Sequence, residues 1–407
     1  MITPPRARRL IDSHCAPLGR TAVSLSSALG YVLAQDVRTA MPLPRFDNSA
    51  MDGFALRSSA SRRATPDRPV CLSIVQSIFA GDNRAHTIGK GEACRIMTGA
   101  PLPRGVDAVI PKERAHVEGS TLVVRQAVEK HRHVRRRGDE IGRNEVVLRR
   151  GQYIHPGVIA CLASVGKKTV RVVRKPVVSV ISTGDEAVEP GTKLGAGQIY
   201  DSNSYMVSAM LEQMAMPQAR CRRIKDHYTA LANAVGAALD KSDVLIVLGG
   251  VSVGDRDYLR RVLKKLRVRE VFWRVRQKPG KPIYFGVKGR RLVFGLPGNP
   301  ASAFTCFYLY VYPALQLLAG KRKDHLAGSV LPIEDPVEPD AERWLMLKGK
   351  TRKRPRAGVD KLPRQGSHMV TSLAETDRIL VIPPDGARIE RGRGVETLRL
   401  PHAEEIP

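Results

Sequence analysis

The sequence predicts an α/β and β multidomain protein. The 407-residue chain is longer than one hydrophobic core usually supports, so several domains are expected. Between residues 176 and 325 strand patterns alternate with helix patterns, which predicts a mostly parallel α/β sheet. Short Val- and Ile-rich segments between recurring Gly and Pro predict β structure in residues 43–143 and again in residues 326–407.

The segments 1–42 and 144–175 flank the first β-rich region and have a mixed pattern. In residues 21–38 the run SLSSALGYVLAQDV predicts a short helix, capped near Ser24 or Ser26. HPGVIACLASV (155–165) predicts a helix closed by Gly166, and the strand TVRVV follows. We therefore expect the β-rich module 43–143 to be inserted between two halves of one domain.

The inserted module and the C-terminal region are expected to contain several short strands each. In the inserted module they are VCLSIVQSI, ACRIM, AVIP and TLVVRQAV. In the C-terminal region, predicted as a small β-barrel or sandwich, they are WLMLKGK, HMVTSL, RILVIPP and GVETLRL.

The α/β region should contain the elements of an open parallel sheet. The expected strands are residues 177–183, 219–224, 244–248, 283–287 and 291–295. The expected helices are residues 204–214, 228–239 and 257–266, with a last helix that starts near Ala301.

The chain carries a formal net charge of +28, with 67 basic and 39 acidic residues. Such a charge favours anionic ligands and partners. The basic runs at 131–137 and 348–356 contain no interleaved aromatic residues, which a single-strand stacking surface requires, so we do not expect nucleic-acid binding.

Cysteine usage and targeting signals predict a cytoplasmic protein. The six cysteines are scattered without a CxxC pair, which is typical of reduced thiols. The N-terminus lacks the apolar core of a secretory signal. Residues 292–320 carry no charge, but PGNP interrupts them, so a strand, a turn and a buried helix are expected there and no membrane span.

The strongest functional signal is the loop GGVSVGDRDY (249–258), which follows an apolar strand. Gly249, Gly250 and Gly254 let the backbone approach a bulky anion. Ser252 can donate a hydrogen bond to that anion, and Asp255 or Asp257 can hold a divalent cation.

Two further turns carry candidate ligand-binding residues. STGDE places Thr183, Gly184 and Glu186 at the end of a strand, where open α/β sheets bind ligands. The alternative is an ordinary helix cap. KPGKP sets Lys278 and Lys281 around a stiff turn suited to an oxyanion, although a solvated charge run is the alternative.

In GLPGNPAS the prolines open a helix with Ser302 in its first turn, and three N–H groups of that helix are expected to face a ligand. Three other motifs can also be explained as ordinary turns or helix caps, and these explanations remain open. FDNSAMDGFAL, with Asp52, fits a self-satisfied Asx turn, and RIMTGAPLP, with Thr98, fits a plain turn before Pro. IYDSN, with Asp201, Ser202 and Asn203, fits helix capping as well as phosphate contact.

No Ser/His/Asp or Cys/His arrangement has a suggestive spacing. Carboxylates and lysines around a phosphate-binding loop point instead to phosphoryl or nucleotidyl transfer assisted by Mg²⁺.

Taken in order, FDNSAMDGFAL, RIMTGAPLP, STGDE, YDSN, GGVSVGDRDY, KPGKP, GLPGNPAS and RQGSHM resemble the molybdopterin molybdenumtransferase family, which includes bacterial MoeA and the E-domain of gephyrin. The resemblance covers the chain from about residue 10 onward. It implies an elongated, L-shaped homodimer of four-domain subunits: a split domain (1–42 and 144–175), the inserted β-rich domain (43–143), a MogA/MoaB-like α/β molybdopterin-binding domain (176–325) and a C-terminal β-barrel (326–407).

The resemblance also implies the reaction. The substrates are molybdate and adenylylated molybdopterin, and molybdate is inserted at the dithiolene with Mg²⁺-dependent release of AMP. The implied partners are molybdopterin adenylyltransferase and the molybdoenzyme apoproteins or their chaperones.

The family's site residues transfer by motif. The carboxylates of the cation and nucleotide region would be Asp52, Glu186, Asp226 and Asp257. Molybdate would be surrounded by Lys278, Lys281, Ser302 and Ser367. The phosphates would be cradled by Gly249, Gly250, Ser252 and Gly254. Thr98 would reach the same cleft with Asp52, across the dimer interface. The remaining cofactor-binding positions would be Thr183, Gly184, Ser202, Pro297 and Asn299.

The sequence departs from the family pattern in two places. A C-terminal-domain Arg is replaced by a stretch in which Arg343 or Lys348 is the candidate, and Asp226 is followed by His227 where the family often has a second Asp. An alternative function is therefore a catalytically weakened paralogue that carries or senses molybdopterin or molybdate. A gephyrin-type anion-binding scaffold is a third interpretation. A preference for tungstate, the identity of the divalent metal and the downstream acceptors are left open.

Overall fold

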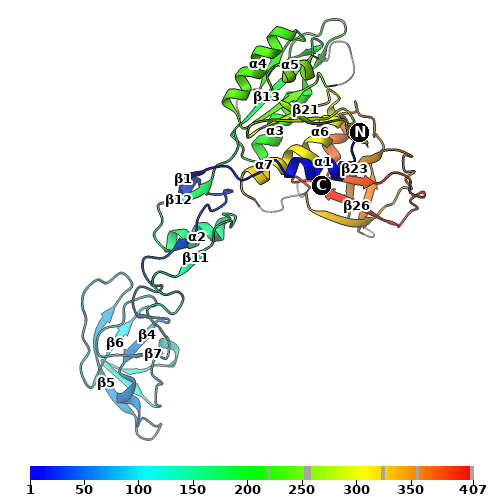
Figure 1. Cartoon of the computed structure of the whole chain (residues 1–407). Coiled ribbons are helices and arrows are strands. Elements are labelled where there is room, and N and C mark those ends of the chain that lie inside the picture. Colours follow the sequence, from blue (N-terminus) through cyan, green and yellow to red (C-terminus); the bar gives the residue numbers. More distant parts are fainter. Residues whose placement is uncertain (218–220, 252–257, 322–325, 354–356, 404–407) are drawn as a thin grey trace. The chain divides into compact units, whose positions relative to one another are not determined.

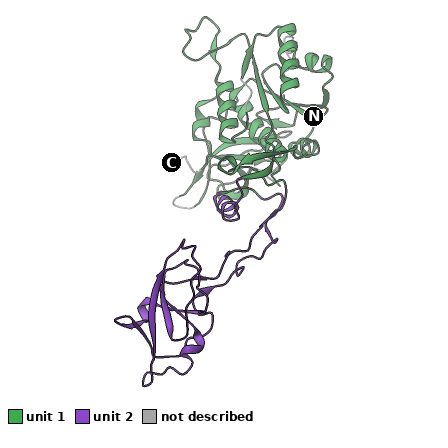
Figure 2. Cartoon of the chain, turned by 90° about the vertical axis from the view of Figure 1, so that its left-hand side faces the viewer, with its two compact units in different colours: residues 1–34, 153–155, 169–407 green, residues 35–152, 156–168 purple. Residues whose placement is uncertain are grey.

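The structure, a computed structural model, describes residues 1–217, 221–251, 258–321, 326–353 and 357–403. The chain forms two compact units (Figure 2). The first unit comprises residues 1–34, 153–155 and 169–407, and the second comprises residues 35–152 and 156–168. The finer division into four domains stays a prediction.

The first unit is built on a six-stranded α/β sheet (Figure 1). Its order is β16 (Arg222–Ile224), β13 (Val178–Thr183), β17 (Val244–Leu248), β21 (Arg291–Leu296), β20 (Tyr284–Lys288) and β18 (Arg269–Trp273). The first four strands are parallel to one another. β20 pairs antiparallel with both β21 and β18, so it alone runs in the opposite direction within this sheet. The predicted mostly parallel sheet is confirmed.

Helices cover both faces of this sheet. One face packs against α4 (Tyr228–Lys241) and α5 (Leu259–Lys265). The other packs against α1 (Pro4–Asp12), α3 (Ser202–Gln213), α6 (Pro300–Cys306), a π-helical turn (Phe307–Val311) and α7 (Tyr312–Leu318). Because both faces are covered, all five residues of β17 are buried, which explains its uninterrupted apolar sequence.

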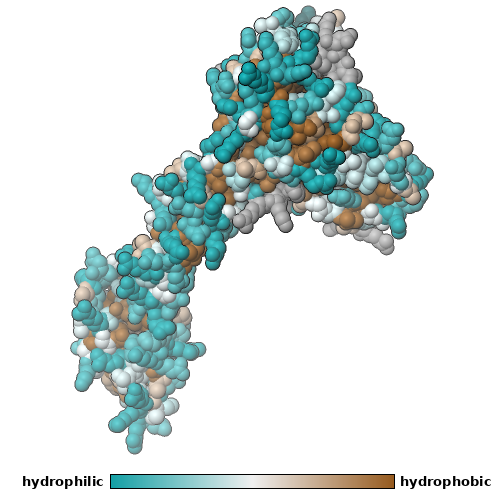
Figure 3. All heavy atoms as spheres, viewed as in Figure 1, coloured by the Kyte–Doolittle hydropathy of each residue, from teal (hydrophilic) through white to brown (hydrophobic). Residues whose placement is uncertain are grey.

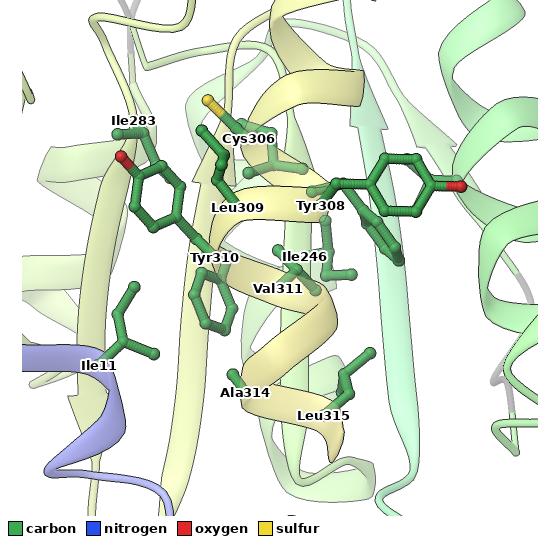
Figure 4. Close-up of a cluster of buried hydrophobic side chains, with 14 of the residues drawn as sticks. Ile11, Ile246, Ile283, Cys306, Tyr308, Leu309, Tyr310, Val311, Ala314 and Leu315 are labelled. Atoms are coloured by element: carbon green, nitrogen blue, oxygen red, sulfur yellow. The ribbon is translucent and has the colours of Figure 1, made fainter. Parts of the chain in front are cut away.

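The segment Pro300–Leu318 is, within the described part of the chain, a helix long and apolar enough to cross a membrane. However, 89% of its most apolar 18-residue window is buried inside the fold. Figure 4 shows its side chains within a cluster that also contains Ile11, Ile246 and Ile283. This segment is therefore the central core helix of the first unit, as the interrupted sequence predicted.

A partly buried ion pair joins the chain segments that lead into β13 and β17. Asp243, just before β17, accepts hydrogen bonds from Arg174 Nη1 (2.7 Å), Arg174 Nη2 (2.9 Å) and the N–H of Val177 (2.8 Å). Burial acts to raise the pKa of Asp243, but these hydrogen bonds outweigh burial and leave its pKa below the usual value.

The Asp243→Asn variant should therefore lose about 1–3 kcal/mol of unfolding free energy at neutral pH. A carboxylate with a lowered folded-state pKa stabilises the fold above its unfolded pKa of about 4 and loses that contribution as the pH falls further. Urea unfolding at pH 7 and at successively lower pH should show the difference between wild type and variant shrinking below about pH 4. A constant difference across this range would contradict the assignment.

A second sheet in the first unit contains C-terminal strands. Its order is β19 (Gln277–Lys278), β23 (Trp344–Arg352), β25 (Arg378–Ile382), β26 (Gly394–Arg399) and β22 (Gly328–Pro332), and β24 (Gly358–Lys361) pairs with β23. The strand expected at HMVTSL is wrong, because Thr371–Glu375 forms a 3-10 helix. β19 comes from the α/β region, so this sheet joins the two regions directly.

The helix expected within residues 21–38 is also wrong. Arg20–Ser24 forms β1, which pairs antiparallel with β12 (Thr169–Val173), and only Leu25–Ser27 forms a 3-10 turn. The Ser24 hydroxyl bonds to the hydroxyls of Ser26 (2.9 Å) and Ser27 (3.0 Å) and caps no helix. Pairing with a strand some 150 residues away overrides the local helical pattern.

The second unit is built on another six-stranded sheet. Its order is β7 (Ala108–Pro111), β4 (Gly53–Leu56), β6 (Glu92–Ile96), β5 (Val70–Ile78), β9 (Thr121–Val124) and β8 (His116–Glu118). Short pairs join β2 (Val37–Arg38) to β11 (Val146–Leu148) and β3 (Asn48–Ser49) to β10 (Val134–Arg135), and the predicted helix is α2 (Pro156–Ser164). The predicted β-rich character of this region is confirmed.

Hydrophilic side chains cover most of the visible face of both units (Figure 3). This agrees with the large share of charged residues, which make up 26% of the chain.

Candidate functional site

A cavity of about 640 Å³ lies at the carboxyl ends of β13 and β17, beside the turn that follows β21. This is the edge at which open α/β sheets bind ligands. The sequence-predicted residues that line it are Thr183, Gly184, Glu186, Ser202, Asp226, Gly249, Gly250, Pro297 and Asn299. The structure thus brings together Asp226 and residues from four separate motifs.

The turn after β17 can be built only with glycine at its first position. Gly249 has φ +86°, and a Cβ there would lie 2.9 Å from both the carbonyl oxygen and the Oγ1 of Thr183. Thr183 in turn donates from its hydroxyl to the carbonyl of Leu248 (3.3 Å). The two strand ends are therefore packed backbone to backbone, which leaves the main chain of the turn at the cavity wall.

The first turn of α3 forms another wall. Asp201 caps the helix: its carboxylate accepts from the N–H of Ser204 (3.0 Å) and from the Ser204 hydroxyl (2.6 Å). The capping interpretation is therefore confirmed for Asp201, while Ser202 and Asn203 line the cavity. Asn203 Nδ2 donates to the carbonyl of Gly298 (2.6 Å) and so fastens α3 to the Pro297–Pro300 turn.

The N-terminus of α6 offers less to a ligand than the sequence suggested. Asn299 Nδ2 donates to Ser367 Oγ (3.1 Å), and the N–H of Ala301 donates to the carbonyl of Ser367 (3.0 Å). Pro300 has no N–H at all. The expectation of three free N–H groups is therefore wrong. Ser302 in this turn is 4% exposed.

Lys278 and Lys281 are both exposed, on the turn that leads from β19 into β20. Neither lines the cavity, but Pro282, the next residue, does. The N–H of Val275 donates to the carbonyl of Lys281 (3.0 Å), which closes this turn on itself. The lysines therefore stand beside the cavity rather than inside it.

Glu186 and Asp226 are the predicted carboxylates at the cavity wall. The N–H of Asp226 donates to Asp185 Oδ1 (3.1 Å), so the 184–186 and 225–227 turns are in contact. Within the described residues no group of three His, Cys, Asp or Glu side chains is placed to hold a metal ion. Asp257, with Ser252 and Gly254, lies outside the described residues.

Asp52 and Thr98 meet in the second unit. Asp52 Oδ1 accepts from the N–H (2.8 Å) and the hydroxyl (2.7 Å) of Thr98, and Lys112 Nζ lies 4.0 Å from Oδ2. The hydrogen bonds from the Thr98 backbone and then from its side chain lower the pKa of Asp52. The two motifs therefore form one local, ionised group.

The two candidates for the C-terminal-domain Arg have different surroundings. Arg343 pairs with Asp340 through its Nη2 (2.8 Å to Oδ2). Lys348 is 2% exposed, and its Nζ lies 3.4 Å from the carbonyls of Gly366 and Met369. Burial lowers the pKa of Lys348. Lys348 therefore holds, through these carbonyls, the loop on which Ser367 and His368 lie.

Sequence reasoning did not assign His368 to the site and named Asn203 only within the motif YDSN, yet both line the cavity. Asn203 stands in the motif YDSN next to Ser202, and His368 follows Ser367 in RQGSHM. Their position beside predicted site residues was the available signal. Ser367 itself is placed against Asn299 rather than among the lining residues.

An α/β sheet with a glycine-lined cavity at its carboxyl edge, flanked by lysines and carboxylates, is typical of proteins that bind phosphorylated small molecules. Comparison with known families agrees. Residues 2–166 match the MoeA N-terminal region (domain I and II), residues 179–317 match a probable molybdopterin binding domain, and residues 331–400 match the MoeA C-terminal region (domain IV).

The relatives point the same way. The chain is 37% identical over 315 residues to the molybdopterin molybdenumtransferase of Staphylococcus epidermidis, covering 77% of this chain and 75% of that protein. It is 36% identical over 298 residues to the Staphylococcus aureus protein of the same name, covering 73% and 71%. A crystal structure of the molybdopterin biosynthesis MoeA protein from Pyrococcus horikoshii matches with a TM-score of 0.84 and 29% identity, covering 98% of this chain and 99% of that chain.

The chain belongs to the MoeA family of molybdopterin molybdenumtransferases. It is a transferase of molybdenum cofactor biosynthesis.

Proposed function

We propose that this protein inserts molybdate into adenylylated molybdopterin at the dithiolene, with Mg²⁺-dependent release of AMP. The observation that carries the proposal is the cavity at the carboxyl edge of β13 and β17, where a glycine turn, two carboxylates and, beside them, two lysines meet. An adenylylated pterin needs room for a nucleotide, and a pyrophosphate needs close backbone approach.

Each group has a chemical task in this proposal. The backbone at Gly249 and Gly250 approaches the phosphates, and Asn203 and Ser202 contact the ligand from α3. Lys278 and Lys281 attract and hold the molybdate dianion as two point charges. Mg²⁺, held by Glu186, Asp226 and Asp257, would supply neutralisation of charge on the pyrophosphate.

The remaining assignments belong to the same proposal. The protein acts in the cytoplasm as a homodimer, takes its substrate from molybdopterin adenylyltransferase and delivers its product to molybdoenzyme apoproteins or their chaperones. The placement of Asp52 and Thr98 at this cleft remains a prediction from the family motif.

The test is AMP release from adenylylated molybdopterin with Mg²⁺, with and without micromolar molybdate. AMP release that depends on molybdate and leaves molybdenum on the pterin is the expected result. Tight nucleotide binding without release under either condition would overturn insertion and favour the carrier or sensor function.

Removing Mg²⁺ with a chelator should stop AMP release, and release that continues unchanged would exclude the cation from the proposal.

A further inference from the structure

A network of hydrogen-bonded, buried polar side chains lies directly beneath the turn that carries Lys278 and Lys281. It consists of Gln277, Cys306 and Tyr310. Gln277 and Cys306 are 0% exposed and Tyr310 is 1% exposed. Cys306 ends α6, and Tyr310 lies in the π-helical turn that follows; Figure 4 shows both on this helical segment.

The hydrogen bonds of this network lead from Tyr310 through Gln277, and from Cys306, to carbonyls of the turn. The Tyr310 hydroxyl donates to Gln277 Oε1. Gln277 Nε2 donates to the carbonyl of Pro279 (3.0 Å) and lies 3.6 Å from Cys306 Sγ. The Cys306 thiol donates to the carbonyl of Gly280 (3.5 Å). Two consecutive carbonyls of the turn are thus held from inside the fold.

The thiol and the hydroxyl that donate hydrogen bonds in this network keep their protons. Burial raises the pKa of the Cys306 thiol and of the Tyr310 hydroxyl well above their ordinary values. Because every link from Tyr310 to the turn has a donor and an acceptor, the arrangement needs no water and no ligand to be satisfied.

Gly280 shows how closely the turn rests on this support. Its φ is +92°, and a Cβ there would lie 2.5 Å from Cys306 Sγ and 2.7 Å from Gln277 Nε2. The same Cβ position is 3.7 Å from the carbonyl of Ser302. The lysine turn and the first turns of α6 are therefore packed as one rigid piece.

We propose that Gln277 is a positioning residue for molybdate binding. It fixes the backbone between Lys278 and Lys281, so that the two ammonium groups are presented to one oxyanion. Gln277 is fully buried and acts only through the turn above it. This inference rests on the proposed function, in which these lysines hold molybdate.

The test is the Gln277→Met variant, which keeps the side-chain size and removes both hydrogen-bonding atoms. We expect its KM for molybdate in the AMP-release assay to rise about tenfold. The turn loses its direct hydrogen bond from Gln277 to the carbonyl of Pro279, and the net loss of one such bond changes an equilibrium by about that factor. The maximal rate and the dissociation constant for the adenylylated substrate should stay within about twofold of wild type.

Gln316→Met is the matched control. Gln316 lies in α7 of the same helical segment and is 4% exposed, and none of its described hydrogen bonds reaches the lysine turn. The same substitution there should leave the KM for molybdate unchanged. An equal rise in both variants would show that any change in this core disturbs the site and would overturn the specific role of Gln277.

A double-mutant cycle separates positioning from general stability. When Lys281→Ala is already present, adding Gln277→Met should raise the KM for molybdate by less than about twofold. Both changes weaken the same contact between Lys281 and molybdate, so their effects should not add. Full additivity would overturn the proposal. If Gln277→Met does not fold, Tyr310→Phe replaces it: it removes only the donor to Gln277 and should raise the KM about threefold.

The outcomes also separate this inference from the function on which it rests. If alanine at Lys278 and Lys281 abolishes molybdate dependence while Gln277→Met and Tyr310→Phe leave the KM unchanged, the positioning role fails alone. If the lysine variants themselves respond to molybdate like wild type, the assignment of the turn to molybdate fails.

Discussion

The double variant Lys278→Ala/Lys281→Ala should lower molybdate-dependent AMP release by about 10²–10³-fold at limiting molybdate. Both ammonium groups are exposed on one short turn beside the cavity, so the double variant removes two neighbouring positive charges from that place. Nucleotide binding, which depends on the glycine turn and α3, should change little. The measurement is the initial rate of AMP release across a molybdate titration.

The matched control is the double variant Lys241→Ala/Lys288→Ala. Lys241 ends α4 and Lys288 ends β20, so both lie at the opposite edge of the sheet, next to the beginnings of β17 and β21. This variant loses the same net charge. Equal losses in both double variants would attribute the effect to the overall charge of +28 rather than to the turn.

The Gly53→Ala variant should destabilise the second unit by about 3 kcal/mol or more. Gly53 lies in β4 between β6 and β7, and a Cβ there would stand 1.9 Å from the carbonyl oxygen of Ile110. The strand must shift away from its neighbour, which also displaces Asp52 from Thr98. Thermal unfolding and protease resistance of the second unit measure the effect.

Gly119→Ala is the control for this variant. Gly119 belongs to the same unit and has φ +59°, but a Cβ there meets nothing within 4 Å. It should cost about 1 kcal/mol through backbone strain alone. A Gly53→Ala variant no less stable than Gly119→Ala would contradict the steric argument.

The sequence predicted those elements whose limits are set locally. The strand Val244–Leu248 is found as expected because a polar Asp243 and a glycine turn bound its apolar run. α1 was missed, although Ala7 and Ile11 lie one turn apart on its buried face. Its nine residues are dominated by Arg and Pro, so burial against the core, and not propensity, holds it in place.

The site residues also fall into those that the local sequence pattern places and those that only tertiary packing places. Thr183 ends a strand, and Gly184, Gly249 and Pro297 each follow a strand directly, so the local pattern was enough to place them at one edge. His368 comes from the C-terminal region, and its approach to this cavity depends on tertiary packing that no local pattern encodes. The burial of Lys348 under the 366–369 loop is likewise visible only in three dimensions.

The pairing of β19 with β23 has a practical consequence for anyone who wishes to dissect this protein. Gln277 and Lys278, which open the lysine turn, align with Trp344 and Leu345. A fragment that stops before the C-terminal region would keep the parallel strands and the glycine turn, but it would leave the edge of β19 bare and remove Ser367 and His368. Under the proposed function, in which this turn holds molybdate, a fragment cut there should bind nucleotide more readily than oxyanion.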